Sequence, residues 1–368
     1  MVKSKLKPLH FIYDGGYNIR INRYLVHSID QGSRPAFCYP DFYNIHANKR
    51  TSSWGIDDDN LDLAFYPKNR YVSNMIPAKN DPICLRKIFK DFDCDVVHAH
   101  HLNSAFYSIN LGLPTVFDDW EFFLNYMRYL PLLFNYWLYK KRPDKIVLGM
   151  FMRALDRFRN PYILKKIFKL APIIVTNRFV KEEYDSFGAK TFWVPNMPLN
   201  FEREYVESKQ IKKISRLTTG YIGRLYNDNK QNPLRNASGI AELWRRENIG
   251  DLYIFEGKNT CTHLELLCKL KSFHFNLLYW EPKSFHRYYT QNKPFLASIL
   301  GIPTIISASL VDTVNLLGEY ALPVMTIRDI PLVMKSYLEN PRKLILNPTH
   351  FWEYYEKNIF SAYQEALN

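Results

Sequence analysis

Arginine, lysine and glycine lie together after a short strand-like run in the second half of the chain. The run Thr218–Ile222 has the length of a buried strand; Gly223 and Arg224 follow it, and Lys230 comes six residues after Arg224. A guanidinium and an ammonium group at the end of a strand can neutralise a diphosphate. Taken alone, the pair fits a surface salt bridge better, so its meaning depends on the motifs around it.

Two further segments offer groups for an anion. Gly15 and Gly16 follow the first strand-like run of the chain, and glycines there let backbone N–H groups approach a phosphate or a sugar. A turn without any ligand explains these glycines equally well. Asn292 and Lys293 precede a helical stretch that ends at Gly301, so they stand at the helix end that favours an anion.

Three histidines, His98, His100 and His101, come close together at the end of another strand-like run. Alternation along a strand places His98 and His100 on one face, and His101 begins the loop. Zinc is one interpretation, but no Asp, Glu or Cys at ligand spacing accompanies them, so we predict no metal. His98 is predicted to be a core histidine, whereas a histidine at the strand's end can donate a hydrogen bond to a sugar or phosphate.

Acidic side chains flank a tryptophan in the segment Phe117-Asp118-Asp119-Trp120-Glu121, again after a strand-like run. The carboxylates of Asp118 and Glu121 can accept hydrogen bonds from the hydroxyls of a sugar or an acceptor, and the indole offers a stacking face. The same acids at the start of a helix would stabilise the helix dipole. The sequence does not decide between these two interpretations.

Strand-like runs alternate with helix-length segments along the whole chain, which is typical of parallel α/β layers. The alternation stops at residues 199–216, a charged segment with little core pattern, and then restarts. We therefore predict a first domain over 1–198, a linker over 199–216, a second domain over 217–346 and a C-terminal helix within 347–368. The predicted strands are Leu9–Tyr13, Asp95–Ala99, Thr115–Phe117, Ile173–Thr176 and Phe192–Val194, then Thr218–Ile222, Leu252–Phe255, Phe275–Leu278 and Thr304–Ile306.

Composition and charge restrict the class of protein. The 368 residues exceed one typical core, and a hydrophobic content of 47% indicates a globular protein. Lys and Arg exceed Asp and Glu by 13, which gives a positive field that attracts anions. The basic residues are scattered and form no nucleic-acid-binding motif, so no nucleic-acid partner is expected.

Cysteine usage and apolar runs indicate a compartment. The five cysteines form no CxxC pair, which fits a reducing environment. The apolar run near the N-terminus is too short for a signal peptide, and no stretch approaches the ~18 apolar residues of a membrane-spanning helix. We therefore predict a cytoplasmic protein. The segment Tyr129–Tyr139, flanked by basic residues, leaves open a peripheral contact with a membrane surface, with a helix packed on its own domain as the alternative.

Taken in order, five segments resemble motifs of the group 1, or family 4, glycosyltransferases of the GT-B fold. "DVVHAHHLNSA" resembles their "DvvHaHs" strand, and "PTVFDDWE" is similar to "PvvyDxHE", with Trp120 where a His is usual. "IIVTNRFVKEEYDSFGAKTFWVPNMP" resembles the strand, helix, "yG" and "vPN" that end their first domain. "GYIGRLYNDNK" resembles "vGRlxxxK" with one extra residue before the Lys, and "NKPFLASILGIPTIIS" resembles "NKxxEyxaxGxPvI".

This resemblance implies a fold and roles for particular residues. It implies an α/β protein with two Rossmann-like parallel-sheet domains that face each other across a cleft, and a C-terminal helix that crosses back to the first domain. It makes His100 the active-site histidine. It also places Arg224 and Lys230 on the diphosphate of a nucleotide-sugar donor, and Gly15 and Gly16 under that donor.

One departure from the family concerns the ribose of the donor. The family usually has two Glu residues where this chain has Tyr288 and Leu296, and neither can accept the hydrogen bonds of a ribose as a carboxylate would. We predict that Glu281, beside Trp280, makes this contact instead.

The motifs and the resemblance together predict a glycosyltransferase of the hexosyltransferase type. It would move a sugar from a nucleotide-sugar to an acceptor that the sequence leaves open between glycan, lipid and protein, with retention of configuration implied by the resemblance. Basic side chains would stabilise the leaving diphosphate, so neither a cofactor nor a metal is expected. Two alternatives stay open: a non-catalytic nucleotide-sugar- or glycan-binding protein on the same scaffold, and a basic nucleic-acid-binding protein.

Overall fold

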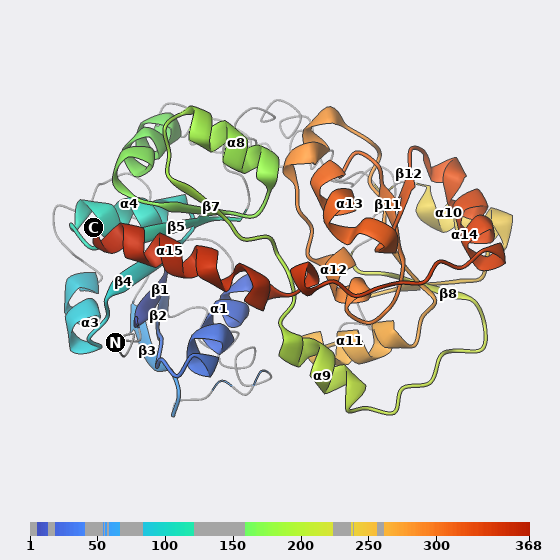
Figure 1. The fold of residues 1–368 in the computed structure, drawn as a ribbon, viewed down its shortest axis with the longest axis horizontal. Helices are drawn as coiled ribbons and strands as arrows, with labels where there is room; N and C mark the ends of the chain where they lie inside the picture. Colours follow the sequence, from blue (N-terminus) through green and yellow to red (C-terminus); the bar gives the residue numbers. More distant parts are fainter. Residues whose placement is uncertain are drawn as a thin grey trace, which may run out of the picture. The chain divides into compact units, whose positions relative to one another are not determined.

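The computed structural model describes residues 6–13, 19–40, 54, 56, 59–66, 84–120, 159–223, 237, 239–255 and 261–368. These residues form two compact units, each with its own β-sheet (Figure 1). The described residues of the first unit lie before 121, between 159 and 194, and after 354. Those of the second unit lie between 195 and 354, so the chain returns to the first unit with its last residues.

The first unit is built on a seven-stranded parallel sheet with the order β3-β2-β1-β4-β5-β6-β7. Every residue of β1, β2, β4 and β5 is buried, as expected for parallel strands covered on both faces. The register pairs Ile12 of β1 with His100 of β4, and His100 with Asp118 of β5, so the carboxyl ends of these adjacent strands are level. The strands are β1 (Pro8–Ile12), β2 (Ala36–Pro40), β3 (Asp62–Tyr66), β4 (Val96–His100), β5 (Thr115–Asp119), β6 (Ile173–Val175) and β7 (Thr191–Trp193).

Helices with one apolar face pack on this sheet. The C-terminal helix α15 packs against strands β4 to β7 and buries Ile359, Ala362 and Tyr363, which lie three and four residues apart and so share one face (Figure 1). Helix α4 is followed by Gly112 at φ +69°, a conformation that glycine adopts without steric cost. The helices are α1 (Ile19–Asp30), α3 (Leu85–Asp91), α4 (Leu102–Asn110), α8 (Arg178–Ser186) and α15 (Glu356–Leu367), with a further helical segment over 159–170.

The second unit is built on a five-stranded parallel sheet with the order β12-β11-β10-β8-β9. Its strands are β8 (Thr218–Tyr221), β9 (Asp251–Ile254), β10 (Phe275–Leu278), β11 (Thr304–Ser307) and β12 (Ala321–Val324). Pro323 lies in β12, which is an edge strand, where the missing N–H of proline removes no bond on the outer side. The helices are α9 (Asn200–Glu207), α10 (Ile240–Glu247), α11 (His263–Lys271), α12 (Lys293–Ser298), α13 (Val311–Leu317) and α14 (Ile330–Glu339).

The fold class predicted from the sequence, two Rossmann-like parallel-sheet domains, is confirmed. Each of the nine predicted strands corresponds to an observed strand, whereas β2, β3 and β12 were not predicted. The predicted linker, 199–216, lies within the second unit and includes α9, which packs on α11. Val206 and Glu202 of α9 are buried, and the carboxylate of Glu202 accepts a bond from the backbone N–H of Leu199, so this charged segment folds as part of a core.

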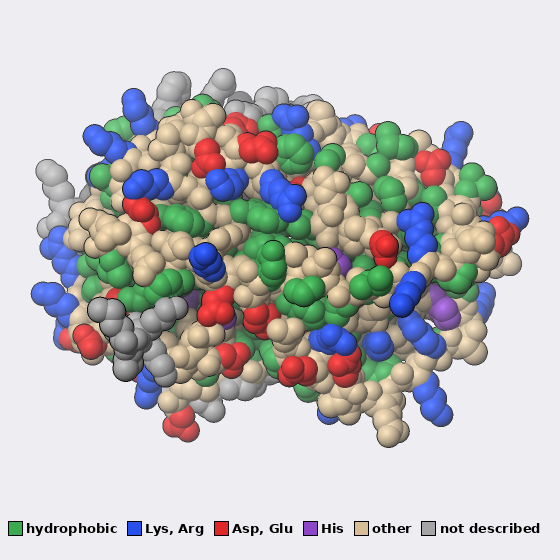
Figure 2. Space-filling view, viewed as in Figure 1, with side chains coloured by type: hydrophobic (Ala, Val, Ile, Leu, Met, Phe, Trp, Pro, Cys, Tyr) green, Lys and Arg blue, Asp and Glu red, His purple; other side chains and the backbone are tan. Residues whose placement is uncertain are grey.

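Figure 2 shows Lys and Arg side chains spread over the face in view, with Asp and Glu among them. Within the part of the chain that the structure describes, no helix is long and apolar enough to cross a membrane. The segment Tyr129–Tyr139, for which a membrane-surface contact was left open, lies outside the described residues.

Candidate functional site

The predicted site residues divide between the two units. His100 and Asp118 lie at the carboxyl ends of β4 and β5 in the first unit. Asn292, Lys293 and Glu281 lie in the second unit, after β10 or at the start of α12. The remaining predicted residues lie outside the described part of the chain: Gly15, Gly16, Glu121, Arg224 and Lys230.

Lys293 lies over the backbone at the carboxyl end of β8. A Cβ atom at Gly223 would lie 3.3 Å from Nζ of Lys293 and 3.3 Å from the ring of Tyr221. Gly223 has φ +149°, which side chains rarely adopt, so both its backbone conformation and its surroundings favour glycine. The two segments that the sequence singled out for anion binding are therefore brought together by the fold, with the ammonium group of Lys293 beside the half-buried Gly223.

Buried polar contacts hold the loop that carries Lys293. Thr290 donates from Oγ1 to Oδ2 of Asp312 at 2.8 Å, and both side chains are buried. The backbone N–H of Gln291 donates to Oγ1 of Thr313 at 3.3 Å. Because Asp312 and Thr313 belong to α13, this helix fixes the loop just before α12 and with it the position of Lys293.

Tyr288 and Leu296 stand at the two positions where the resembling family usually has Glu, and both make contacts within the protein. Leu296 is buried in an apolar cluster of the second unit. The hydroxyl of Tyr288 accepts a bond from Nη2 of Arg287 at 2.7 Å. Glu281, the predicted ribose contact, is exposed and pairs with Lys283 at 3.7 Å. Glu281 is thus accessible to a ligand, while Leu296 is part of the core.

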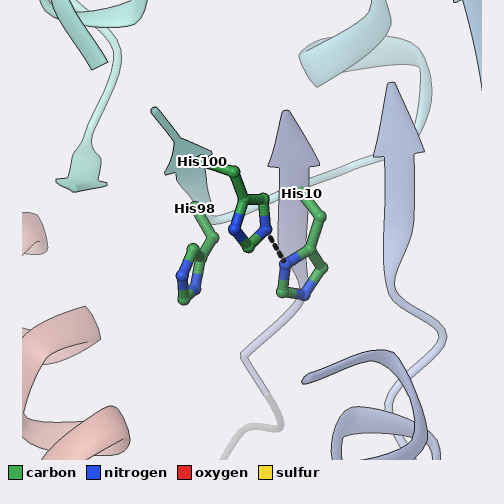
Figure 3. Close-up of side chains that lie close together, drawn as sticks. All are labelled: His10, His98 and His100. Carbon is green, nitrogen blue, oxygen red and sulfur yellow. Dashed lines mark hydrogen bonds between the residues drawn. The ribbon is translucent and has the colours of Figure 1, made fainter. Parts of the chain in front are cut away.

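The first unit encloses a cluster of histidines. His10 from β1 and His98 and His100 from β4 lie side by side and are fully buried (Figure 3). Nδ1 of His10 and Nε2 of His100 are 3.1 Å apart, and Nδ1 of His98 is 2.8 Å from the hydroxyl of Tyr363. The cluster therefore links two neighbouring strands to the C-terminal helix α15.

Asp118 carries the negative charge of this cluster. Arg20 of α1 donates from Nε and Nη2 to the carboxylate of Asp118 at 2.9–3.1 Å, and from Nη2 to the hydroxyl of Tyr24 at 2.9 Å. Nε2 of His98 and Nδ1 of His100 face Oδ2 of Asp118 at 3.8 and 3.5 Å. Asp118, predicted to meet a sugar or an acceptor, is instead fully buried and held by Arg20.

One arrangement of protons fits all of these contacts. Burial lowers the pKa of His10 well below its usual range, lowers that of His98, and lowers that of His100 to about 3, so all three are neutral at pH 7. Burial alone would raise the pKa of Asp118, but Arg20 and the histidines hold it well below its usual value. His10 then donates from Nδ1 to His100, and Tyr363 donates to His98.

The histidine cluster also has the composition of a metal site. One ring nitrogen from each of His10, His98 and His100 lies within 4.8 Å of the others. However, Nδ1 of His98 and both Nδ1 of His10 and Nε2 of His100 already take part in the hydrogen bonds, and the charge of Arg20 lies against the neighbouring carboxylate. These bonds form a core that joins α1, β1, β4, β5 and α15. Nε2 of His10, Nε2 of His98 and Nδ1 of His100 have no hydrogen-bond partner among the residues that the structure describes.

Sequence reasoning did not single out His10, Arg20, Tyr24 or Tyr363. The available signal was slight: His10 stands inside the otherwise apolar strand β1, and Arg20 lies on the buried side of α1. A polar residue inside a buried run indicates that a partner exists, because unpaired buried polar groups are costly, but it does not identify that partner.

No protein-family model and no curated protein matches the sequence. Among solved structures, the chain is similar to HepE from Anabaena in complex with UDP and glucose, with 10% identity over 98% of both chains and a TM-score of 0.56. It is also similar to sucrose-phosphate synthase from Thermosynechococcus elongatus, with 12% identity over 98% of this chain and 95% of that one and a TM-score of 0.54. A glycosyltransferase from Rickettsia africae has 12% identity over 99% of both chains and a TM-score of 0.52.

The chain has the GT-B fold. At these identities the likeness establishes the arrangement of strands and helices, and the chemistry follows from the residues themselves. In a GT-B chain with two parallel sheets, the carboxyl ends of the strands are the edges where ligands bind. Lys293 with Gly223 in one unit, and the ends of β4 and β5 in the other, lie at such edges.

Proposed function

We propose that the protein is a glycosyltransferase that moves a sugar from a nucleotide-sugar donor to an acceptor. The observation that carries the proposal is the approach of Nζ of Lys293 to Gly223 at the carboxyl end of β8. An ammonium group beside a glycine is suited to a phosphate, because the charge and a backbone N–H group can act on the same oxygens. The GT-B relative HepE was solved with UDP and glucose, which is the chemical class proposed for the donor.

In the proposed reaction, the leaving diphosphate takes up negative charge as the bond to the sugar breaks. Lys293 would stabilise that charge, together with Arg224 and Lys230, which follow Gly223 in the sequence. No metal is needed for this role, since cationic side chains provide the charge. The finer proposals are a hexosyltransferase of the family 4 type, retention of configuration, a cytoplasmic location and binding of the donor ribose by Glu281.

A nucleotide-binding measurement with a matched lysine control tests the donor site. Lys293→Ala should weaken binding of nucleoside diphosphates by about 1.5–3 kcal/mol, or roughly 10- to 150-fold, the scale of a charged hydrogen bond. Lys335, an exposed residue of α14, provides the control, because Lys335→Ala should leave the affinity unchanged. Isothermal titration calorimetry with UDP, GDP and ADP gives both values; equal affinities for the two variants would contradict the assignment of Lys293.

A turnover assay separates transfer from binding alone. The chain is incubated with a panel of sugar nucleotides, and mass spectrometry detects release of the nucleoside diphosphate. Release from at least one donor supports the proposed activity. Binding without release would favour the non-catalytic alternative, for which the burial of Leu296 in place of a ribose-binding Glu is the specific observation. If the chain binds no sugar nucleotide at all, the proposed function is wrong.

A further inference from the structure

Two lysines and a histidine lie together at the amino edge of the second sheet. Lys213 belongs to the segment that leads from α9 to the start of β8 along the outside of the second unit (Figure 1). Lys271 ends α11, and His274 directly precedes β10. Because β8 and β10 are neighbours and the backbone N–H of His274 bonds to the carbonyl of Thr218, these residues reach the same end of the sheet. Lys213, Lys271 and His274 are called the basic cluster below.

Backbone carbonyls hold the two ammonium groups of the basic cluster. Nζ of Lys213 donates to the carbonyl of Phe273, and Nζ of Lys271 donates to the carbonyl of Leu300 at 2.9 Å. These carbonyls lie just after the ends of α11 and α12, where the helix dipole favours a cation. An ammonium group has three N–H donors, so each lysine keeps two donors beyond the one that its carbonyl accepts.

His274 adds a donor whose tautomer is fixed by the backbone. The N–H of Thr218 donates to Nδ1 of His274 at 3.2 Å, so Nδ1 is the acceptor and the proton of the neutral ring is on Nε2. Burial and the charge of Lys213 lower the pKa of His274, which keeps the ring neutral at pH 7. The basic cluster therefore offers N–H donors from three side chains.

The basic cluster has no carboxylate partner among the residues that the structure describes. Arg216, on the same segment as Lys213, pairs instead with Asp251 at 3.2 Å. Partial burial of the ammonium group and the nearby charge of Lys271 lower the pKa of Lys213 to about 8. Like charges held close together cost free energy, and an anion in contact with both lysines would remove this cost. The helix ends account for one bond of each lysine but not for their convergence with His274.

We propose that the basic cluster is a second anion site, separate from the donor site, and that it binds the phosphate group of a small soluble molecule. A phosphate monoester carries a charge of about −1.5 to −2 and three terminal oxygens, which suits three side chains that act as donors. The two sites lie at opposite ends of β8. The basic cluster lies beside Thr218, whereas Lys293 lies beside Gly223, about 16 Å further along an extended chain. The site therefore takes no part in the proposed transfer reaction.

Calorimetric titration of the full chain with inorganic phosphate and with glucose 6-phosphate, at constant ionic strength, tests the site. All variants are made in the Lys293→Ala background, which removes the lysine of the donor site. In this background Lys213→Met should weaken phosphate binding at least about tenfold, because it removes a charged donor and keeps the length of the side chain. Lys271→Met should have a similar effect. His274→Asn should weaken binding less, because its side-chain oxygen can still accept from the N–H of Thr218 while only a neutral donor is lost.

Lys212→Met is the matched control, because it removes the same charge from the next residue of the same exposed segment. Its phosphate affinity should be nearly unchanged. Thermal unfolding gives a second measure: phosphate should raise the Tm of the Lys293→Ala protein and of its Lys212→Met variant, but not that of its Lys213→Met variant. A lower Tm of Lys213→Met without phosphate reflects the lost bond at the end of α11. The response to phosphate, rather than the Tm itself, therefore decides the role of Lys213.

Each outcome decides the proposal. Tighter binding of glucose 6-phosphate than of inorganic phosphate indicates a phosphorylated metabolite, and the reverse indicates free phosphate; both support the site. The proposal is overturned if neither binds in the Lys293→Ala background, or if Lys213→Met leaves the affinity unchanged, which would limit this lysine to the end of α11. It is also overturned if Lys212→Met weakens binding as much as Lys213→Met, since a diffuse positive field would then explain the binding.

Discussion

Acidification should destabilise the first unit through its buried histidines. In the folded chain, burial lowers the pKa of His10 well below its usual range and that of His100 to about 3. In the unfolded chain both have the ordinary value near 6.5. The unfolded state therefore binds more protons as the pH falls below about 6.5, and stability that is complete above this pH is lost progressively toward pH 3.

The size of this effect follows from proton linkage. A histidine that stays neutral when folded and has a pKa of 6.5 when unfolded should reduce the free energy of unfolding by about 1.9 kcal/mol between pH 7 and pH 5. His10 and His100 together should cost about 4 kcal/mol, and His98, whose pKa is also lowered, adds to the loss. This is a large share of the ~5–15 kcal/mol that stabilises a typical protein. At lower pH, protonation of Asp118 acts in the same direction, since its pKa is lowered on folding.

Urea unfolding followed by far-UV circular dichroism at pH 7, 6 and 5 measures the loss. His100→Asn provides the comparison, because asparagine is polar but cannot take up a proton. This variant should be less stable than wild type at pH 7, because His10 loses its partner. Between pH 7 and pH 5, its free energy of unfolding should fall by about 1.9 kcal/mol less than that of wild type. Equal pH dependence in the two proteins, or a wild type that is equally stable at pH 7 and 5, would refute the assignment of neutral buried histidines.

Four further predictions concern the core and the donor site. Tyr363→Phe leaves Nδ1 of His98 buried without its partner, so the free energy of unfolding should fall by about 1–3 kcal/mol in urea titrations, and no change would contradict the hydrogen bond. Gly223→Ala should weaken nucleotide binding at least about tenfold in calorimetry, because an alanine Cβ would be strained and would displace the lysine above it; unchanged affinity would argue against this backbone as the phosphate site. Glu281→Gln should lower donor affinity, whereas Leu296→Ala should lower stability by about 2–5 kcal/mol and leave affinity nearly unchanged; the reverse pattern would show that the ribose is bound elsewhere. Transfer activity should persist in EDTA, and activity that is lost there and restored by manganese would show that a metal is required.

The sequence alone was sufficient to predict the fold class. Apolar runs of strand length alternate with helix-length segments, and this local periodicity reflects burial on both faces of a parallel sheet. The strands that escaped prediction are β2, β3 and β12, and β12 contains a proline that usually counts against a strand. Only its place at the edge of the sheet makes Pro323 acceptable, and position in a sheet is a property of the whole fold.

The sequence also located the segments that bear chemistry but could not determine which side chains reach a ligand. His98, His100 and His101 are adjacent in the sequence, yet the fold encloses the first two and leaves the third half-buried beside Trp120. The fold likewise encloses Asp118, whose carboxylate is fully buried although the residue lies near the end of its strand.

The partners that decide these outcomes are distant in the chain. Arg20 and Asp118 are 98 residues apart, His10 and His100 are 90 apart, and His98 and Tyr363 are 265 apart. Local propensity and periodicity act over a few turns of helix or one strand, so they indicate that a residue is buried but not what it meets. The order of strands in the sheet and the return of α15 to the first unit bring these groups together, and only the tertiary structure contains that information.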